Sequence, residues 1–385
     1  MTIPFIPEFT IPHFLLDVRV GPQALPPPAL LPEIPILSAV AGSGGTCELR
    51  TTDMHPAPET WETPAGWFAV LGRPLRNNRF DAQGAMAACW QNGHFDEAAL
   101  RELNGEFLLI AFDPATGRLH VANDRFTAIP FYYLIRSGRL LATPFFSDLW
   151  SAASRLGACP LDRAALLEFL FFQRVLGAKT FLTDGKFLPD AHILEFDVTG
   201  LRLRRYWQRD YGKSHQPLSE QAARMATLLR QSIRRKTQDG QRWGHFLSGG
   251  MDSRSVLAAF EQDFPTCFTA TVGENRELRT ARSIAGAKGA PHVALVLDEE
   301  HYGRIREAAV RISGGMYNYD HCLFLGFQAA VRSQADVCFH GYGLDYMFQG
   351  MYIPRRRFRL AGRNLHLQRL RQLPDDLAGY YLEHV

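Results

Sequence analysis

The sequence predicts a mixed α/β protein in which a mostly antiparallel, layered domain precedes a domain built on a parallel sheet. From about residue 66 to residue 150, short segments alternate apolar and polar side chains, which is the period of half-buried strands. After residue 243, strand-length apolar runs alternate with helix-length amphipathic runs, which indicates parallel strands and right-handed crossovers. A chain of 385 residues with 46% hydrophobic side chains can bury at least two cores.

In the amino-terminal half, the first 65 residues are rich in proline and glycine, which favours edge strands and turns. Strands are then expected over 67–71, 106–112, 118–123, 131–135 and 140–143. A helix is expected over 162–172, because an acid precedes leucines at helical spacing. Two further strands, 192–196 and 201–206, lead into a polar connector at 208–217.

In the carboxyl-terminal half, a helix with a serine at its start is expected over 219–235. The α/β run is expected to contain strands at 243–247, 265–272, 291–297 and 335–339, and helices at 277–289, 302–312 and 323–332. Ligands of parallel sheets bind beyond the carboxyl ends of the strands. The glycine turns at Gly249 and Gly341 both fall at such ends.

The segment 248–253, Ser-Gly-Gly-Met-Asp-Ser, reads as a strand, a glycine turn and a helix start. Gly249 and Gly250 are expected to adopt conformations closed to other residues and to let a phosphate approach the backbone. The serine hydroxyls at either end add donors. Asp252 would repel a phosphate unless a cation lay between them, which argues for magnesium bound together with a nucleotide. The alternative is a polar turn of any α/β domain.

Composition excludes several classes of protein. The formal charge of +3 is too small to argue for nucleic-acid binding, and the six cysteines show no metal-ligand spacing, so reduced core thiols are expected. Residues 1–12 lack the pattern of a signal peptide, and no uncharged apolar stretch of about 18 residues is present. We therefore expect a cytoplasmic protein that binds neither membranes nor nucleic acids.

The pattern S-G-G-x-D-S resembles the PP-loop of the ATP pyrophosphatases, which cut ATP between its α and β phosphates. Segments 103–107, 123–126 and 130–133 resemble the glutaminase-type domain of glutamine-dependent asparagine synthetases. Segment 341–345, Gly-Tyr-Gly-Leu-Asp, is similar to the second signature loop of their synthetase domain. The resemblance covers roughly residues 65–352 and is most specific at the PP-loop.

The resemblance implies an α-β-β-α sandwich of the N-terminal-nucleophile type joined to a PP-loop α/β domain. It divides the chain into a degenerate glutamine amidotransferase domain at 1–155, a connecting segment at 156–215 and an ATP-binding synthetase domain at 216–385. Such enzymes transfer AMP to a carboxylate and release pyrophosphate. Ammonia or an amine then displaces AMP to give an amide.

The resemblance also implies roles for individual residues. Two carboxylates, Asp252 and Asp345, would hold Mg²⁺ on the pyrophosphate, although Asp345 could instead cap a helix after Gly343. Val272 would line the adenosine. The residues that would bind ATP, including one glycine of the second loop, are Leu247, Ser248, Gly249, Gly250, Asp252, Ser253 and Gly341.

Departures from the family pattern bear on glutamine hydrolysis. The family uses a cysteine at position 2 as nucleophile, whereas this sequence has Thr2. Asp124 matches the acid that would bind the glutamine amine, but Asn123 replaces the arginine before it. The glutaminase half is therefore expected to be inactive.

A further departure lies in the second loop. Tyr342 replaces a glutamate of the asparagine synthetases and resembles the catalytic tyrosine of the β-lactam synthetases. A phenol needs a carboxylate partner to act as a base near neutral pH, and Asp376 lies at a suitable distance along the chain. The alternatives are an aromatic lid on the nucleotide for Tyr342 and a turn or helix cap for Asp376.

The sequence after Tyr352 contains no lysine motif like the one that the family uses during adenylation, so we expect either a truncated chain or incomplete chemistry. The basic run 355–359 with Arg363 is either a solvated helix face or a contact for phosphates or an acidic substrate.

The function expected from these residues is an ATP- and Mg²⁺-dependent amide ligase of the asparagine synthase type, as used in amino-acid biosynthesis. Its substrates would be a carboxylate, such as aspartate, a related acid or a uronic acid, and ammonia or an amine. Intramolecular amide closure and a nucleotide-binding pseudoenzyme partner are the alternatives, and a homodimer is compatible with each. The acid, the nitrogen donor and the oligomeric state are left open.

Overall fold

The structure is a computed structural model that describes residues 13–21, 34–52, 54, 56–210, 216–238, 240–316, 322–343, 355–360 and 362–368. The chain divides into two compact units. The first comprises Met1–Leu218 with Glu299–Gln328, and the second comprises Ser219–Asp298 with Ala329–Val385. The first unit contains antiparallel sheets and the second a parallel sheet, which confirms the expected fold class.

Two antiparallel sheets form the centre of the first unit. One has the strand order β13-β11-β12-β1-β3-β2, and the other has the order β15-β14-β10-β9-β5-β4, with β6 paired to β5. The strands of the first sheet are β1 (His13–Val20), β2 (Ile36–Gly42), β3 (Gly45–Thr52), β11 (Tyr132–Arg136), β12 (Arg139–Thr143) and β13 (Gly185–Phe187). Those of the second sheet are β4 (Glu59–Thr63), β5 (Gly66–Arg76), β6 (Arg79–Phe80), β9 (Asn104–Asp113), β10 (Arg118–Asn123), β14 (His192–Asp197) and β15 (Gly200–Arg205). A small hairpin joins β7 (Trp90–Gln91) and β8 (His94–Phe95).

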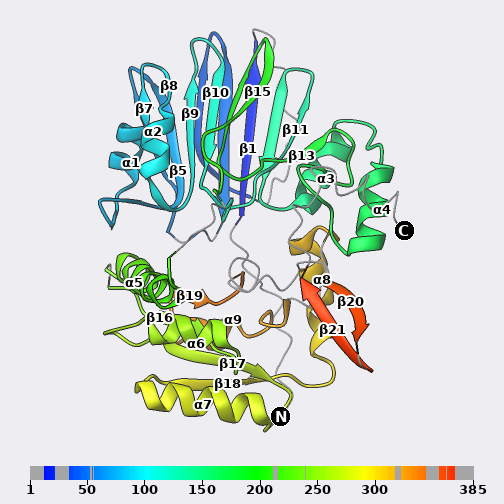
Figure 1. Ribbon diagram of the computed structural model, residues 1–385. Helices are drawn as coiled ribbons and strands as arrows, with labels where there is room; N and C mark the ends of the chain where they lie inside the picture. Colours follow the sequence, from blue (N-terminus) through cyan, green and yellow to red (C-terminus); the bar gives the residue numbers. More distant parts are fainter. Residues whose placement is uncertain are drawn as a thin grey trace. The chain divides into compact units, whose positions relative to one another are not determined.

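Successive side chains of a strand point to opposite faces, so the continuous buried runs of β5, β9 and β12 give each sheet two apolar faces. Three buried clusters pack against these faces. One cluster lies between the sheets and includes Phe14, Trp67 and Ile110. A second packs the outer face of the β5-β9 sheet against α1 (Ala82–Cys89) and α2 (Glu97–Glu102). A third packs the other sheet against α3 (Phe146–Arg155). The four layers visible in Figure 1 are therefore the predicted α-β-β-α sandwich.

Helix α8 (His301–Ser313) follows the second unit's strands in sequence but packs on α3 of the first unit. The hydroxyl of Ser147 donates to the carbonyl of Arg311 at 2.8 Å, and the Arg311 guanidinium lies 3.5 Å from the Asp148 carboxylate. Gly314 ends the helix so close to the Phe146 side chain that a Cβ would approach it to 2.7 Å. Residues 299–328 are thus an excursion of the chain into the first unit.

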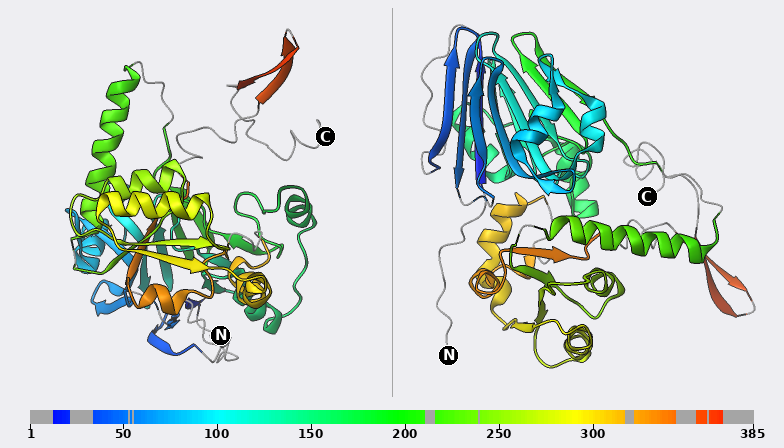
Figure 2. Two further views of the ribbon diagram at one scale, coloured as in Figure 1. Left: turned by 90° about the horizontal axis from the view of Figure 1, so that it is seen from below. Right: turned by 90° about the vertical axis from the view of Figure 1, so that its left-hand side faces the viewer.

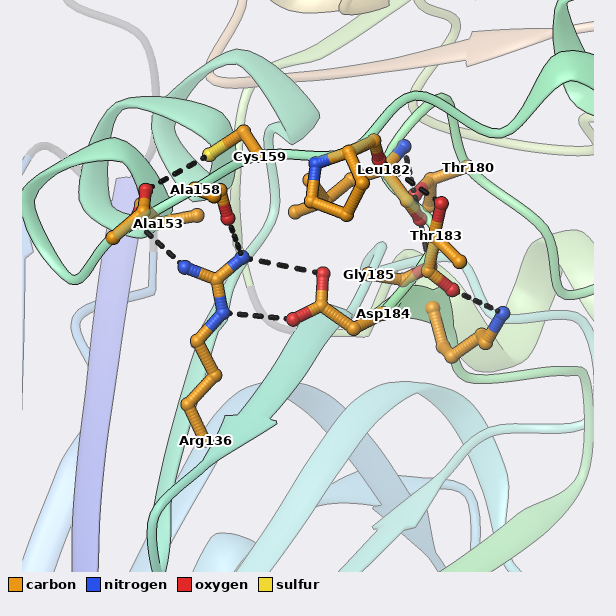
Figure 3. A network of polar contacts seen from close by, with 12 residues as sticks. Arg136, Ala153, Ala158, Cys159, Thr180, Leu182, Thr183, Asp184 and Gly185 are labelled. Carbon is orange, nitrogen blue, oxygen red and sulfur yellow. Dashed lines mark hydrogen bonds and ion pairs between the residues drawn. The ribbon is translucent and has the colours of Figure 1, made fainter.

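Arg136 fixes the segment that follows α3, as Figure 3 shows. Its guanidinium donates to the Asp184 carboxylate at 2.7 and 3.3 Å, and to the carbonyl oxygens of Ala153 at 2.9 Å and Ala158 at 2.8 Å. One planar group therefore holds the end of α3 and the turn before β13 to strand β11. Helix α4 (Arg163–Phe172), capped by Asp162, follows in the same segment.

The second unit has a four-stranded parallel sheet of order β18-β17-β16-β19. Figure 2 shows α6 and α7 on one face of this sheet and α9 on the other. Its strands are β16 (Trp243–Phe246), β17 (Thr266–Thr271), β18 (His292–Val296) and β19 (Val337–His340). Its helices are α5 (Leu218–Lys236), α6 (Met251–Ala258), α7 (Arg276–Lys288) and α9 (Gln328–Arg332), and β20 (Arg355–Leu360) pairs with β21 (Arg363–Gln368) in a separate hairpin. None of the described helices has the length and apolarity to cross a membrane.

Some elements differ from the sequence-based expectation. Helices α1, α2 and α3 were not expected from the pattern; α1 is made mostly of small apolar residues with no helical period, and α2 has only 6 residues. The helix expected over 323–332 is wrong in its first half, because regular α-helix begins at Gln328. A glycine at 326 with φ +91° interrupts it.

A buried ion pair joins β1 to β12, and its contribution to the stability of the first unit can be tested. Arg139 donates to both oxygens of Asp17, at 2.8 and 2.6 Å, and both side chains are buried. We expect Arg139→Met to lower the free energy of unfolding by about 3–5 kcal/mol, because it leaves a buried carboxylate without its main partner. Adding Asp17→Leu should recover most of that loss in urea unfolding. If the double variant is no more stable than the single one, the pair is not what Arg139 contributes.

Candidate functional site

The loop between β16 and α6 lies at the carboxyl edge of the parallel sheet, where the sequence places a ligand. Helix α6 begins at Met251, with Gly250 at its N-cap position and no side chain capping it. The first turn of an α-helix has N–H groups without partners inside the helix, and the helix dipole makes that end positive. The start of α6 can therefore donate hydrogen bonds to an anion.

The two loop glycines are not required by backbone conformation. Gly250 has φ −74° and ψ 161°, which any residue can adopt, and Gly249 is not among the glycines with positive φ. The expectation that they adopt conformations closed to other residues is therefore wrong. A Cβ at Gly249 would touch Glu277 and Thr280 of α7 at 3.6 Å, and one at Gly250 would meet the Ser248 hydroxyl at 3.2 Å. Neither contact is an overlap of backbone atoms, so a methyl group fits at both positions in the protein without ligand.

Two serine hydroxyls close the loop from inside. The Ser253 hydroxyl accepts from the backbone N–H of Ser248 at 3.0 Å and lies 2.8 Å from the Ser248 hydroxyl. Ser248 Oγ also accepts from the N–H of Gly250 at 3.2 Å. Ser253 is buried, so its hydroxyl serves the shape of the loop, and Ser248 is the more accessible of the two donors.

The second loop begins in direct contact with the first. A Cβ at Gly341 would lie 2.7 Å from the backbone nitrogen of Ser253 and 2.9 Å from the carbonyl carbon of Asp252. Only glycine fits there, because those neighbours are backbone atoms of α6 that cannot rotate away. Strands β16 and β19 are adjacent and parallel, with Phe246 paired to His340, so both loops leave the same edge of the sheet.

Tyr342 lies at this edge and is 69% exposed. Its backbone N–H donates to Nδ1 of His340 at 3.2 Å, and the two rings meet edge to face with centroids 6.4 Å apart. Its expected partner Asp376 and the expected metal ligand Asp345 lie outside the described residues, as does Thr2.

The other predicted residues occupy distinct positions around the loop. Asp252 is half-buried in the first turn of α6. Leu247 is buried in the core, its N–H donates to Phe268 at 2.8 Å and its carbonyl accepts from Thr269 at 2.7 Å, so the sheet already uses its backbone. Val272 is 77% exposed, one residue beyond the end of β17, where the expected strand extended one residue further.

The sequence reasoning missed two residues beside the loop. Arg254, in the first turn of α6, donates from Nε to the carbonyl of Gly250 at 3.1 Å, which keeps its guanidinium next to the loop. His245 lies within β16 and is completely buried. Each breaks a local rule that could have revealed it: a cation at a helix start opposes the dipole, and a histidine interrupts an otherwise apolar central strand.

Electrostatics at the loop combine opposite contributions. Burial lowers the pKa of His245, while hydrogen bonds to the carbonyls of Ser253 and Phe339 act to raise it. Among the residues that the structure describes, no group of three or more His, Cys, Asp and Glu side chains could hold a metal ion. The carboxylate of Asp252 is the kind of ligand that Mg²⁺ prefers, and the open glycine backbone and the uncapped helix suit a polyphosphate.

In the first unit, the positions that matched a glutamine site are used internally. Asp124 is buried and accepts from the N–H groups of Phe107, Phe126 and Ala128, at 3.3, 2.8 and 3.0 Å. Burial raises the pKa of Asp124, although these hydrogen bonds act to lower it. Asn123 is completely buried as well. Its amide nitrogen donates to Thr127 and Pro189, and its oxygen accepts from the N–H of His192.

Two protein-family models match different parts of the chain. A family model described as Asparagine synthase matches residues 224–384, and one described as Glutamine amidotransferase domain matches residues 77–207. The chain is 27% identical to asparagine synthetase [glutamine-hydrolyzing] 3 of Bacillus subtilis over 43% of its length and 26% of the relative's. It is 23% identical to asparagine synthetase [glutamine-hydrolyzing] 1 of the same organism over 69% of its length and 43% of the relative's.

A putative asparagine synthetase [glutamine-hydrolyzing] of Mycobacterium tuberculosis is 24% identical over 76% of the chain and 48% of the relative. The chain thus spans less than half the length of these relatives. A solved glutamine phosphoribosylpyrophosphate amidotransferase from B. subtilis covers 73% of the chain and 65% of its own, at 9% identity and a TM-score of 0.31, which is too low to carry an argument.

The glycines of the two loops should respond differently to alanine. Gly341→Ala should lower the free energy of unfolding by about 1–3 kcal/mol, because the new methyl group overlaps the backbone of α6. Gly249→Ala should change stability by less than about 0.5 kcal/mol, because its methyl group would meet Glu277 and Thr280 of α7 only at van der Waals distance. Chemical denaturation measures the stability of both variants. Equal losses of stability in both variants would contradict this assignment of the glycines.

Proposed function

We propose that this chain, which belongs to an asparagine synthetase-like family with a glutamine amidotransferase domain, is an ATP-dependent amide ligase that forms AMP and pyrophosphate. The observation that carries the proposal is the junction of the two loops. No side chain caps the start of α6, and the second loop begins against it at Gly341. This arrangement supports binding of a nucleotide polyphosphate along one loop and chemistry at the other.

The proposed reaction has two steps. A carboxylate oxygen of the substrate attacks the α-phosphorus of ATP, the bond to the β-phosphate oxygen breaks, and pyrophosphate leaves. The nitrogen lone pair of ammonia or an amine then attacks the carbonyl carbon of the acyl adenylate. AMP leaves with the electrons of the C–O bond, and the nitrogen loses a proton. The substrate class is a small carboxylic acid, with aspartate, a related acid and a uronic acid as candidates.

The residues of the loop would divide the work between binding and charge. The N–H groups at the start of α6 and the Ser248 hydroxyl would bind the phosphates, while Ser253 keeps the loop in shape. Asp252, together with Asp345, would hold the Mg²⁺ that neutralises the pyrophosphate. Arg254 is placed by its bond to Gly250 to contact the same group, which develops negative charge as it leaves.

We infer that Val272 borders the adenosine. Leu247 would not contact ATP directly but would hold the start of the loop in the sheet. Tyr342 is exposed at the carboxyl edge of the sheet, which is compatible with a role in proton removal from the attacking amine, partnered by Asp376. His340, whose ring meets the Tyr342 ring edge to face, is a second titratable group beside the second loop. An internal amine as nucleophile, which would close a ring, is the alternative that this tyrosine favours.

We further propose that the amidotransferase half does not hydrolyse glutamine. The side chain of Asn123 bonds inside the domain through both its nitrogen and its oxygen, and Asp124 accepts three backbone N–H groups. Three of the roughly four acceptor sites of the Asp124 carboxylate are thus occupied by backbone N–H groups, which leaves little capacity for the amine of glutamine. The proposed division is an amidotransferase-like domain at 1–155, a connecting segment at 156–215 and a synthetase domain at 216–385.

Variants of the loop test the ligase assignment. With Mg·ATP, ammonium and a panel of carboxylic acids, we expect pyrophosphate release, and Asp252→Asn should slow it by about a hundredfold or more. Arg254→Ala should raise the KM for ATP by about tenfold, because a charge-assisted contact to phosphate is lost. Arg282→Ala, which removes an exposed ion pair with Glu274 in the same unit, is the matched control and should leave both parameters unchanged. Full activity of Asp252→Asn would refute the assignment.

The nitrogen source separates the remaining alternatives. Mass spectrometry of the products should show amide formation with ammonium and none with glutamine as the only nitrogen source, because Asn123 and Asp124 are committed to internal bonds. Product formed without any added nitrogen would favour ring closure by an internal amine. Binding of Mg·ATP without AMP production for any acid would favour a pseudoenzyme.

A further inference from the structure

His245 joins the elements that carry the two loops. Its Nε2 lies 2.8 Å from the carbonyl oxygen of Ser253, in the first turn of α6, and its Nδ1 lies 3.2 Å from the carbonyl oxygen of Phe339 in β19. The ring is completely buried at the end of β16. It therefore links α6, the helix that follows the glycine turn of the 248–253 loop, to β19, the strand that leads into Gly341.

Both hydrogen-bond partners of this ring are carbonyl oxygens, which can only accept hydrogen bonds. A neutral imidazole has one N–H and can satisfy one carbonyl, so its other nitrogen then faces a carbonyl oxygen lone pair to lone pair. An imidazolium donates at both nitrogens and satisfies both contacts. The geometry fits the charged ring, whereas burial disfavours any charge without a nearby anion.

Within the described residues, the neighbours of the ring supply no clear counter-charge. On β19 the titratable neighbours are Cys338 and His340, and repulsion from His340 acts to lower the pKa of His245. On β17 the paired residue is Cys267, whose thiol pKa is raised by burial to about 12, so it stays neutral. On α6 the charged residues are Asp252 and Arg254, of opposite sign. An anion bound at the start of α6 would add the missing negative charge.

We propose that His245 is a positioning residue that holds α6 against β19 as a doubly protonated imidazolium when a nucleotide polyphosphate occupies the 248–253 loop. The proposal rests on the proposed function for the identity of the anion. Binding of the nucleotide would then take up a proton from solvent. The charged ring would fix the spacing between the two loops at the moment when both are needed.

The sign of the pH dependence follows from this linkage. Protonation is favoured in the nucleotide complex and disfavoured in the free protein, so the pKa of His245 is higher in the complex. Affinity for Mg·ATP should therefore be greatest at low pH and fall as pH rises through the two pKa values. The limiting slope is about tenfold per pH unit for one proton.

The experiment is calorimetric titration of Mg·ATP into the full chain, without an acid substrate, in buffers that differ in heat of ionisation. The wild type should take up a measurable fraction of a proton, at most about one. His245→Gln retains a donor near the Nε2 position, cannot be charged, and should lose this uptake together with the pH dependence of affinity. His292→Gln is the matched control, because His292 also lies in the parallel sheet and its pKa is also lowered by burial. It should behave like the wild type.

The outcomes separate the two proposals. Equal proton uptake by His245→Gln and the wild type would overturn the role of His245 while leaving the ligase proposal intact. Failure of the wild type to bind Mg·ATP would instead count against the ligase proposal. If His245→Gln does not fold, ¹⁵N NMR of the histidine-labelled wild type replaces it. Appearance of one doubly protonated ring on adding Mg·ATP is then expected, and no change in any ring would overturn the inference.

Discussion

The candidate site depends on a contact between two backbones, that of Gly341 and that of the first turn of α6. Because β16 and β19 are adjacent and parallel, the loops that follow them leave the same edge of the sheet, but adjacency alone does not fix their separation. The absence of a side chain at Gly341 brings the second loop to within van der Waals contact of Ser253. The His245 ring lies between the same two elements and contacts a backbone carbonyl oxygen of each. Gly341 therefore allows the close approach of α6 and β19, and His245 contacts both.

The loop itself shows how internal bonds leave room for an external ligand. The hydroxyl groups of Ser248 and Ser253 bond to each other within the turn. No side chain caps the start of α6. Arg254 adds a cation where the helix dipole is already positive, an arrangement that costs stability unless an anion is bound. An uncapped helix start and a cation beside it both depart from the sequence preferences of helices, and such departures at one place are typical of a functional site.

Much of the fold was predictable because period and capping act locally. The strands predicted between residues 67 and 143, the strands of the parallel sheet, α5, α7 and the turn at 248–253 follow from alternation, apolar runs, amphipathic spacing and glycine. The edge strands expected in the first 65 residues are wrong for β1 and β3, which lie inside their sheet. Helices α1 and α3 were not predicted: α1 is capped by Asp81 but has no helical period, and α3 begins without a capping side chain. The reason for the glycines at 249 and 250 also needed the structure, because a sequence cannot tell a strained backbone from an open one. A histidine in an apolar strand could have drawn attention to His245, but its role could not be predicted, because it comes from carbonyl oxygens of Ser253 and Phe339.

The chain passes between its two units three times. It passes from the first unit to the second after Leu218, returns after Asp298 and leaves again after Gln328. The middle passage forms α8, which is bound to α3 through Ser147 and Asp148, and only then does the chain enter β19 and Gly341. The strand that brings the second loop to the nucleotide loop is thus preceded by a segment anchored in the amidotransferase-like unit. The first unit would thus have a structural reason to be retained even without glutaminase activity, because the segment that precedes β19 is folded in it.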